Sequence, residues 1–153
     1  MDMLKTTNHE ITFSEVPDEI TLCINISGCP NHCYGCHSPF LWEDIGEPLT
    51  IKDLYYLIDK NSGISCICFM GGDSEPETIN TFAEEIKFCY DIKTAWYSGR
   101  NKRAPEINIK NFDYIKVGPY IEKKGPLTSP TTNQRLYKVV DNELVDITNK
   151  FWK

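Results

Sequence analysis

Four short apolar segments, each closed by a glycine, most constrain the fold of this 153-residue chain. They are rich in β-branched and aromatic residues and are bounded by turn residues, a pattern that is typical of buried strands. The segments are 20–27 (ITLCINIS), 64–70 (ISCICFM), 93–99 (KTAWYSG) and 112–118 (FDYIKVG). The sequence therefore predicts a sheet with at least four short strands.

Two helical patterns separate the first three segments. In LTIKDLYYLIDKN, residues 49–61, Thr50 is a plausible N-cap, and Asn61 with Gly63 would end the helix. In EPETINTFAEEIKFCYD, residues 75–91, Pro76 lies in the first turn, and the spacing predicts an apolar stripe made of Ile79, Phe82, Ile86 and Cys89. The chain thus alternates strand, helix, strand, helix, strand.

The β-α-β-α-β order favours parallel strands joined by crossover connections and places the chain in the α/β class. Four strands with few helices are too little for a closed eight-fold barrel, so we expect a partial, open parallel α/β barrel. The segment NQRLYKVVDNELVDIT, residues 133–148, alternates on both sides of Asp141-Asn142 and predicts a C-terminal hairpin. We expect one domain over residues 1–153.

In parallel α/β folds, sites form at the carboxyl ends of the strands. In this chain, those ends hold a cysteine-rich segment, Gly71-Gly72-Asp73, Ser98-Gly99 and Gly118. The sequence therefore predicts that all four meet at a common mouth.

The cysteine-rich segment is NISGCPNHCYGCHSP, residues 25–39, with Cys29, Cys33 and Cys36 inside eight positions. A structural zinc site usually needs four ligands from two separated pairs, and a second pair with that spacing is missing. A four-iron cluster held by three thiolates keeps one iron open for another ligand. The remaining cysteines fit packing roles as small apolar side chains, and they are Cys23, Cys66, Cys68 and Cys89.

The Cys-x3-Cys-x2-Cys spacing after the first strand resembles that of the radical S-adenosylmethionine (SAM) superfamily. FMGGDSEP looks like the Gly-Gly-Glu type motif of that superfamily, with Asp73 in the acidic place. Over about residues 20–140, the chain is similar to the activating protein of the anaerobic ribonucleoside-triphosphate reductase. The segments that carry this likeness are GCPNHCYGCHSP, FMGGDSEP, TAWYSGR, FDYIKVGPYI and TTNQRLYKV.

The resemblance implies a [4Fe-4S] cluster bound by Cys29, Cys33 and Cys36, with SAM on the open iron. The residues it implies for SAM binding are Gly35, Cys36, His37, Gly71, Gly72, Asp73 and Ser98. Reductive cleavage of SAM would give a 5′-deoxyadenosyl radical, which would generate a glycyl radical on a large reductase. No protein side chain would need to act as acid or base, and a reduced flavodoxin-type protein would supply the electron.

Net charge, hydrophobicity and cysteine count limit which partners and which cellular location we expect for the chain. The net charge of −6 argues against nucleic acid, and no apolar run approaches the ~18 residues of a membrane span. Neither a secretion signal nor an even cysteine count is evident, so we expect a cytoplasmic protein. Residues 92–153 carry 12 basic against six acidic residues. This half is either a solvated surface or a docking face, for which Lys102, Arg103, Lys123 and Lys124 are candidates.

Two alternatives remain open at this point. One is the activase of another glycyl radical enzyme, or another small radical SAM enzyme that modifies a small molecule. The other is a non-catalytic zinc or iron–sulfur module. Iron content and SAM cleavage would separate the module from the enzymes.

Overall fold

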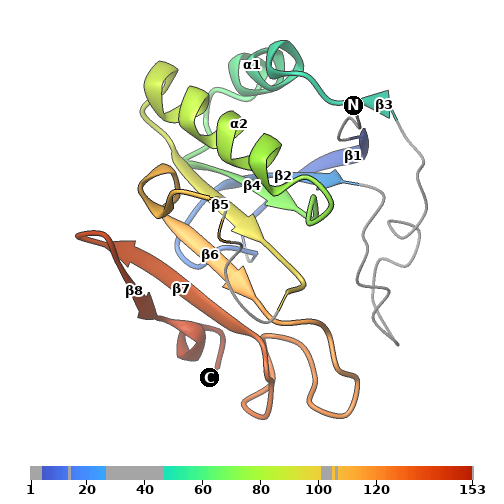
Figure 1. Ribbon diagram of the computed structural model, residues 1–153, viewed down its shortest axis with the longest axis vertical. Helices are drawn as coiled ribbons and strands as arrows, with labels where there is room; N and C mark the ends of the chain where they lie inside the picture. Colours follow the sequence, from blue (N-terminus) through green and yellow to red (C-terminus); the bar gives the residue numbers. More distant parts are fainter. Residues whose placement is uncertain (1–4, 14, 27–46, 101–104, 106, 153) are drawn as a thin grey trace.

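A computed structural model describes residues 5–13, 15–26, 47–100, 105 and 107–152. Within these ranges, eight strands form one open mixed sheet in the order β3-β1-β2-β4-β5-β6-β7-β8 (Figure 1). The strands are β1 (Lys5–Thr12), β2 (Thr21–Ile26), β3 (Glu47–Pro48), β4 (Cys66–Met70), β5 (Lys93–Tyr97), β6 (Tyr114–Val117), β7 (Arg135–Val140) and β8 (Glu143–Asp146). The four segments predicted as strands are β2, β4, β5 and β6.

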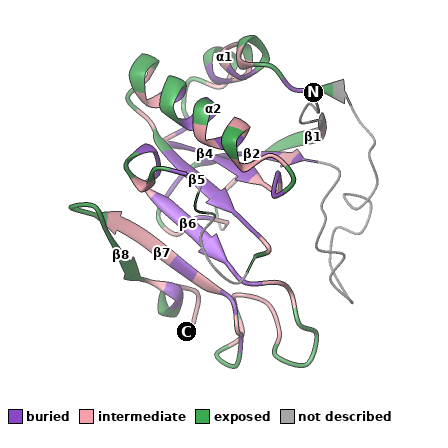
Figure 2. Cartoon of the chain, in the orientation of Figure 1, coloured by how far each residue is buried: buried purple, intermediate pink, exposed green. Residues whose placement is uncertain are grey.

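The centre of the sheet is parallel. β2 pairs with β4, β4 with β5 and β5 with β6, and all three pairings are parallel. These strands are buried on both faces, which explains why they read as nearly continuous apolar runs in the sequence (Figure 2). The parallel arrangement expected from the β-α-β-α-β order is therefore confirmed for these strands.

Helices α1 (Ile51–Lys60) and α2 (Pro76–Cys89) cover one face of the sheet (Figure 1). Thr50 caps α1 in a capping box: its hydroxyl accepts from the Asp53 amide, and the Asp53 carboxylate accepts from the Thr50 amide. The helices bury Leu54, Ile58, Ile79, Phe82, Ala83 and Ile86 against the β-strand residues that point to this face. Both helices lie where the sequence predicted them.

The opposite face has a second, smaller core. It contains Cys23, Cys66, Cys68, Ala95, Tyr97, Tyr114 and Leu136 from the strands. Val16, Leu127, Ile147 and Phe151 cover it from connecting segments and from the short 3-10 helix Thr148–Phe151. Trp96 lies in the core on the helix side and Tyr97 in this smaller core, so the two neighbours face opposite sides, as the strand period requires.

The C-terminal hairpin is confirmed. β7 and β8 pair antiparallel, and the turn residues Asp141 and Asn142 have φ of 51° and 66°. Two successive positive φ values are typical of a type I′ turn, whose twist matches that of the two flanking strands. Asp and Asn tolerate this conformation well.

Strand β1 is an element that the sequence reading did not predict. Its sequence KTTNHEIT is mostly polar. His9, Glu10 and Ile11 are exposed to solvent. β1 pairs antiparallel with β2, with a register shift between Thr6 and Asn8. Because it lacks the continuous apolar run of the central strands, such a segment gives little signal in the sequence.

The placement of Cys89 was wrong. We expected it on the apolar stripe of α2, but it is exposed at the last residue of the helix, and its Sγ lies 3.5 Å from Oη of Tyr55. At 100° per residue, Cys89 lies about 80° around the helix from Ile79, at the edge of the stripe. The packing role holds for Cys23, Cys66 and Cys68, which are buried.

Candidate functional site

The carboxyl ends of β4 and β5 are joined by a buried carboxylate. Asp73, which is fully buried, accepts a hydrogen bond at Oδ1 from Oγ of Ser98, at 2.5 Å, and another at Oδ2 from the Gly99 amide, at 2.8 Å. The guanidinium of Arg100 donates to the Asp73 carbonyl oxygen, at 2.7 Å. The structure therefore brings the predicted site residues Gly71, Gly72, Asp73 and Ser98 together at one edge of the sheet.

Gly71 and Gly72 both need to be glycines for a local reason. Their φ values are 107° and 87°, in the left-handed region that L side chains rarely adopt. A Cβ on Gly71 would lie 3.0 Å from the carbonyl oxygen of Ile26, and one on Gly72 would lie 2.8 Å from Cδ1 of Ile79. Backbone conformation and packing thus account for both glycines, whatever ligand the site takes.

The carbonyl groups of the two glycines each already accept one hydrogen bond. The Trp96 indole donates to the Gly71 oxygen at 2.7 Å, and the Glu75 amide donates to the Gly72 oxygen at 3.0 Å. A carbonyl oxygen has two lone pairs, so a ligand donor is compatible with each of these bonds. The backbone of Gly71 and Gly72 is therefore held in place by hydrogen bonds from Trp96 and Glu75.

The end of β2 lies beside this pair of glycines. Ile26 is the last residue of β2 and is in contact with the Gly71 position. The cysteine-rich segment begins at the next residues along the chain. The predicted residues Cys29, Cys33, Gly35, Cys36 and His37 lie outside the described residues.

The end of β6 adds a buried cation that the sequence reading missed. Lys116 is 9% exposed, and its ammonium donates to the carbonyl oxygens of Ser98, at 3.1 Å, and Gly118, at 2.8 Å. Gln134 and Asn133 border the same turn, since their side-chain amides donate to Gly118 and Pro119, respectively. The sequence signal for a buried cation was a lysine inside the otherwise uncharged strand YIKV.

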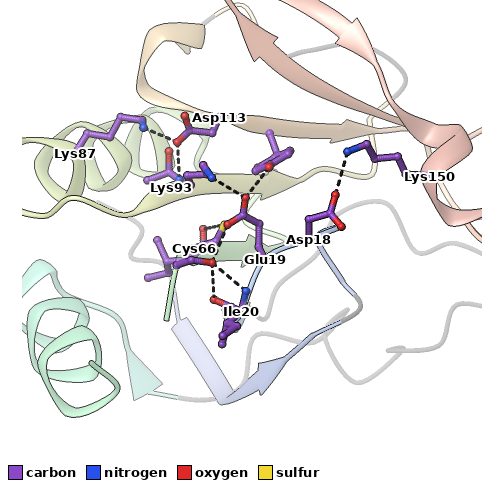
Figure 3. Close-up of polar contacts among 12 residues, drawn as sticks. Asp18, Glu19, Ile20, Cys66, Lys87, Lys93, Asp113 and Lys150 are labelled. Carbon is purple, nitrogen blue, oxygen red and sulfur yellow. Dashed lines mark hydrogen bonds and ion pairs between the residues drawn. The ribbon is translucent and has the colours of Figure 1, made fainter. Parts of the chain in front are cut away.

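A different polar network joins the amino ends of the same strands (Figure 3). Glu19 is 6% exposed and accepts hydrogen bonds from Tyr114 at 2.7 Å, Ser65 at 2.7 Å and Lys93 at 2.9 Å. Burial opposes ionisation of Glu19, but these three hydrogen bonds and the charge of Lys93 outweigh it, so that the pKa lies below its ordinary value. In parallel α/β folds, this edge usually contributes stability rather than chemistry.

A second carboxylate continues the network at this edge. Asp113 accepts from the ammonium of Lys87 at 2.5 Å and from the Thr94 amide at 2.9 Å (Figure 3). Together, Glu19 and Asp113 link the starts of β4, β5 and β6 to α2 and to the segment before β2. Both edges of the parallel strands therefore carry a buried carboxylate, but only the carboxyl edge combines it with the glycine turn Gly71-Gly72.

Searches with protein-family models, among curated proteins and among solved structures found no match to the chain. Within the described ranges, no helix is long and apolar enough to cross a membrane. In the same ranges, no group of three or more histidine, cysteine or acidic side chains is arranged to hold a metal ion.

Proposed function

We propose that this chain is an activase of the radical SAM type, which generates a glycyl radical on an anaerobic ribonucleoside-triphosphate reductase. The observation that supports it most is the tether made by Asp73, which holds the ends of β4 and β5 together beside the end of β2. The cysteine-rich segment leaves the sheet at this point. Cys29 is three residues after Ile26 in the sequence, a separation that spans at most about 11 Å.

In this proposal, Cys29, Cys33 and Cys36 bind a [4Fe-4S] cluster, while Gly35, Cys36 and His37 border SAM. The cluster and SAM, when bound, supply a 5′-deoxyadenosyl radical through one-electron cleavage of the sulfonium. The remaining lone pairs of the Gly71 and Gly72 carbonyls would accept from the SAM amino group. Asp73 and Ser98 act by fastening the residue after the two glycines to the end of β5, because the Asp73 carboxylate accepts from the Ser98 hydroxyl and the Gly99 amide.

The open sheet suits a protein substrate. We infer that β2, β4, β5 and β6 are the parallel strands of a partial α/β barrel whose open side admits a loop of the reductase. The helices α1 and α2 lie on one face of the sheet, away from β7 and β8 (Figure 1). Lys123 and Lys124 are exposed on the segment after β6 and are candidates for contact with an acidic partner such as a flavodoxin.

Anaerobic reconstitution with iron and sulfide tests this proposal. We expect brown protein with about four irons per chain that cleaves SAM to 5′-deoxyadenosine and methionine when dithionite is added. Replacing Cys33 by Ala should abolish cluster assembly. Replacing the exposed Cys89 by Ala is the matched control and should leave the cluster intact.

Three outcomes would contradict the proposal. Colourless protein that binds zinc and no iron would favour a structural metal module. Retention of about four irons in the Cys33→Ala variant would refute the ligand assignment. If SAM is cleaved but the reductase shows no glycyl radical doublet in electron paramagnetic resonance, the substrate is another protein or a small molecule.

A further inference from the structure

Three buried cysteines lie on the sheet face that points away from the helices. Cys23 on β2 is 1% exposed, and Cys66 and Cys68 on β4 are fully buried. All three belong to the smaller core, together with Tyr97 and Tyr114. The proposed function leaves these thiols without a role beyond packing.

The strand register brings two of them into direct opposition. Cys23 is the register partner of Cys68 in the parallel pair of β2 and β4, whereas the partner of Cys66 is Thr21. Neighbouring strands lie about 4.8 Å apart, and disulfides are found at Cα separations of about 4.4–6.8 Å. Cys23 and Cys68 therefore meet the spacing for a bond between their sulfurs, and both point to the same face.

The two thiols have unequal chemistry. A hydrogen-bonding contact with the Cys68 thiol lowers the pKa of Cys23, although burial of Cys23 acts in the opposite direction. The Thr12 hydroxyl, 3.6 Å from Sγ of Cys23, also lowers this pKa. Burial and the neighbouring Cys23 raise the pKa of Cys68. A thiolate is the nucleophile in cysteine oxidation, and the lowered pKa favours Cys23 for that role.

We propose that Cys23 and Cys68 form a redox pair that a peroxide converts to a disulfide between β2 and β4. Cys23 sulfur attacks one peroxide oxygen, the O–O bond breaks, and water leaves while a sulfenic acid remains on Cys23. Cys68 sulfur then displaces the hydroxyl as a second water and forms the S–S bond. In total, two thiols lose two electrons and two protons, and one hydrogen peroxide becomes two waters.

This bond would act on the candidate site through the sheet. Cys23 lies three residues before Ile26, and Cys68 lies three residues before Gly71. The disulfide would therefore join the two strands three residues before the contact between Ile26 and Gly71. The inference depends on the register of β2 and β4 and not on iron or SAM. Its test is therefore separate from that of the proposed function.

Peptide mapping of the full chain tests the pair. The iron-free protein, with Cys29, Cys33 and Cys36 replaced by Ser, is treated with hydrogen peroxide, blocked with iodoacetamide and digested with trypsin without reduction. We expect peptides 6–52 and 61–87 to be joined and two hydrogens lighter than their sum, with Cys66 counted in its carbamidomethyl form. Fragmentation should assign the bond to Cys68, and dithiothreitol should reverse it.

Matched variants complete the test. Cys66→Ala should keep the joined peptides, because Cys66 shares the burial and face of Cys68 but opposes Thr21. Cys68→Ala should lose them while circular dichroism shows an intact fold. The proposal is overturned if peroxide oxidises Cys89 and leaves Cys23 as free thiol, or if fragmentation places the bond at Cys66. Fragmentation of the parent protein decides this even if a variant fails to fold.

Discussion

Removing the Glu19 carboxylate should destabilise the chain more than any other single polar change at the amino edge of the sheet. In Glu19→Ala, the buried hydroxyl of Tyr114 loses its acceptor, and hydrogen bonds to a charged group contribute about 1.5–3 kcal/mol each. Ser65 can turn to the Ile20 carbonyl, 3.4 Å away, and the half-exposed Lys93 can return to water. These two bonds together add about 1 kcal/mol, after discount for solvent. The expected loss is therefore about 3 kcal/mol.

Urea unfolding followed by tryptophan fluorescence measures this loss. A double-mutant cycle with Tyr114→Phe should give a coupling energy of about 1–2 kcal/mol, since the two side chains contact each other directly. A loss below about 0.5 kcal/mol for Glu19→Ala, or no coupling to Tyr114, would refute the network as a source of stability.

The same carboxylate predicts a pH dependence. The pKa of Glu19 is lower in the folded chain than its ordinary value of 4.5, so the unfolded chain binds the proton more readily. The contribution of Glu19 is therefore present above pH 4.5 and is lost as the pH falls toward its folded pKa. The difference in free energy of unfolding between the parent and Glu19→Gln should shrink over that range. Taking the difference between the two proteins cancels the pH-dependent contribution of Glu15, whose pKa is raised mainly by burial. A difference that stays constant with pH would contradict the assignment.

Three further predictions concern other parts of the chain. Asp73→Ala should cost about 3–5 kcal/mol in urea unfolding, because it removes two hydrogen bonds from a buried carboxylate, and amide exchange at Gly99 should quicken; unchanged exchange would contradict the tether. Lys116→Met should cost about 1–3 kcal/mol, because the carbonyls of Ser98 and Gly118 lose a charged donor, whereas exposed Lys123→Met should change stability by less than about 0.5 kcal/mol. Thr50→Ala should cost about 1 kcal/mol in thermal unfolding and Thr50→Ser much less, and equal effects would argue against the cap.

The central strands and both helices could be predicted from the sequence because local signals and burial agree there. The run ISCICFM is apolar on both faces of β4, and Thr50 and Asn61 bound α1 as expected. β1 could not be predicted in this way, because it gains its place from pairing with β2 rather than from its own apolar pattern. Backbone pairing with a neighbouring strand leaves no hydrophobic pattern in the sequence of a polar strand.

The candidate site was predictable only as a set of positions. That the turn after β4 and the turn after β5 meet follows from the parallel order, and the structure brings Asp73 and Ser98 to hydrogen-bonding distance. The sequence gives no means of knowing that the Asp73 carboxylate is occupied by Ser98 and Gly99, since this depends on the exact approach of two loops. Lys116 was missed for the same reason: its partners are backbone carbonyls, which have no sequence signature.

The two polar networks at opposite edges of the parallel strands should separate stability from function. Glu19 is linked to the starts of β4, β5 and β6, at the opposite ends of these strands from the glycine turns. Under the proposed function, its variants should lower stability while protein that remains folded still binds SAM. Asp73 fastens the end of the glycine turn to β5, so under the proposed function its variants should weaken SAM binding beyond any loss of folded protein. Equilibrium binding of SAM to the reconstituted protein, corrected for the folded fraction, distinguishes the two. If Glu19→Ala and Asp73→Asn weaken corrected binding equally, the carboxyl edge has no special part in holding the ligand, and the assignment of the site to that edge is wrong.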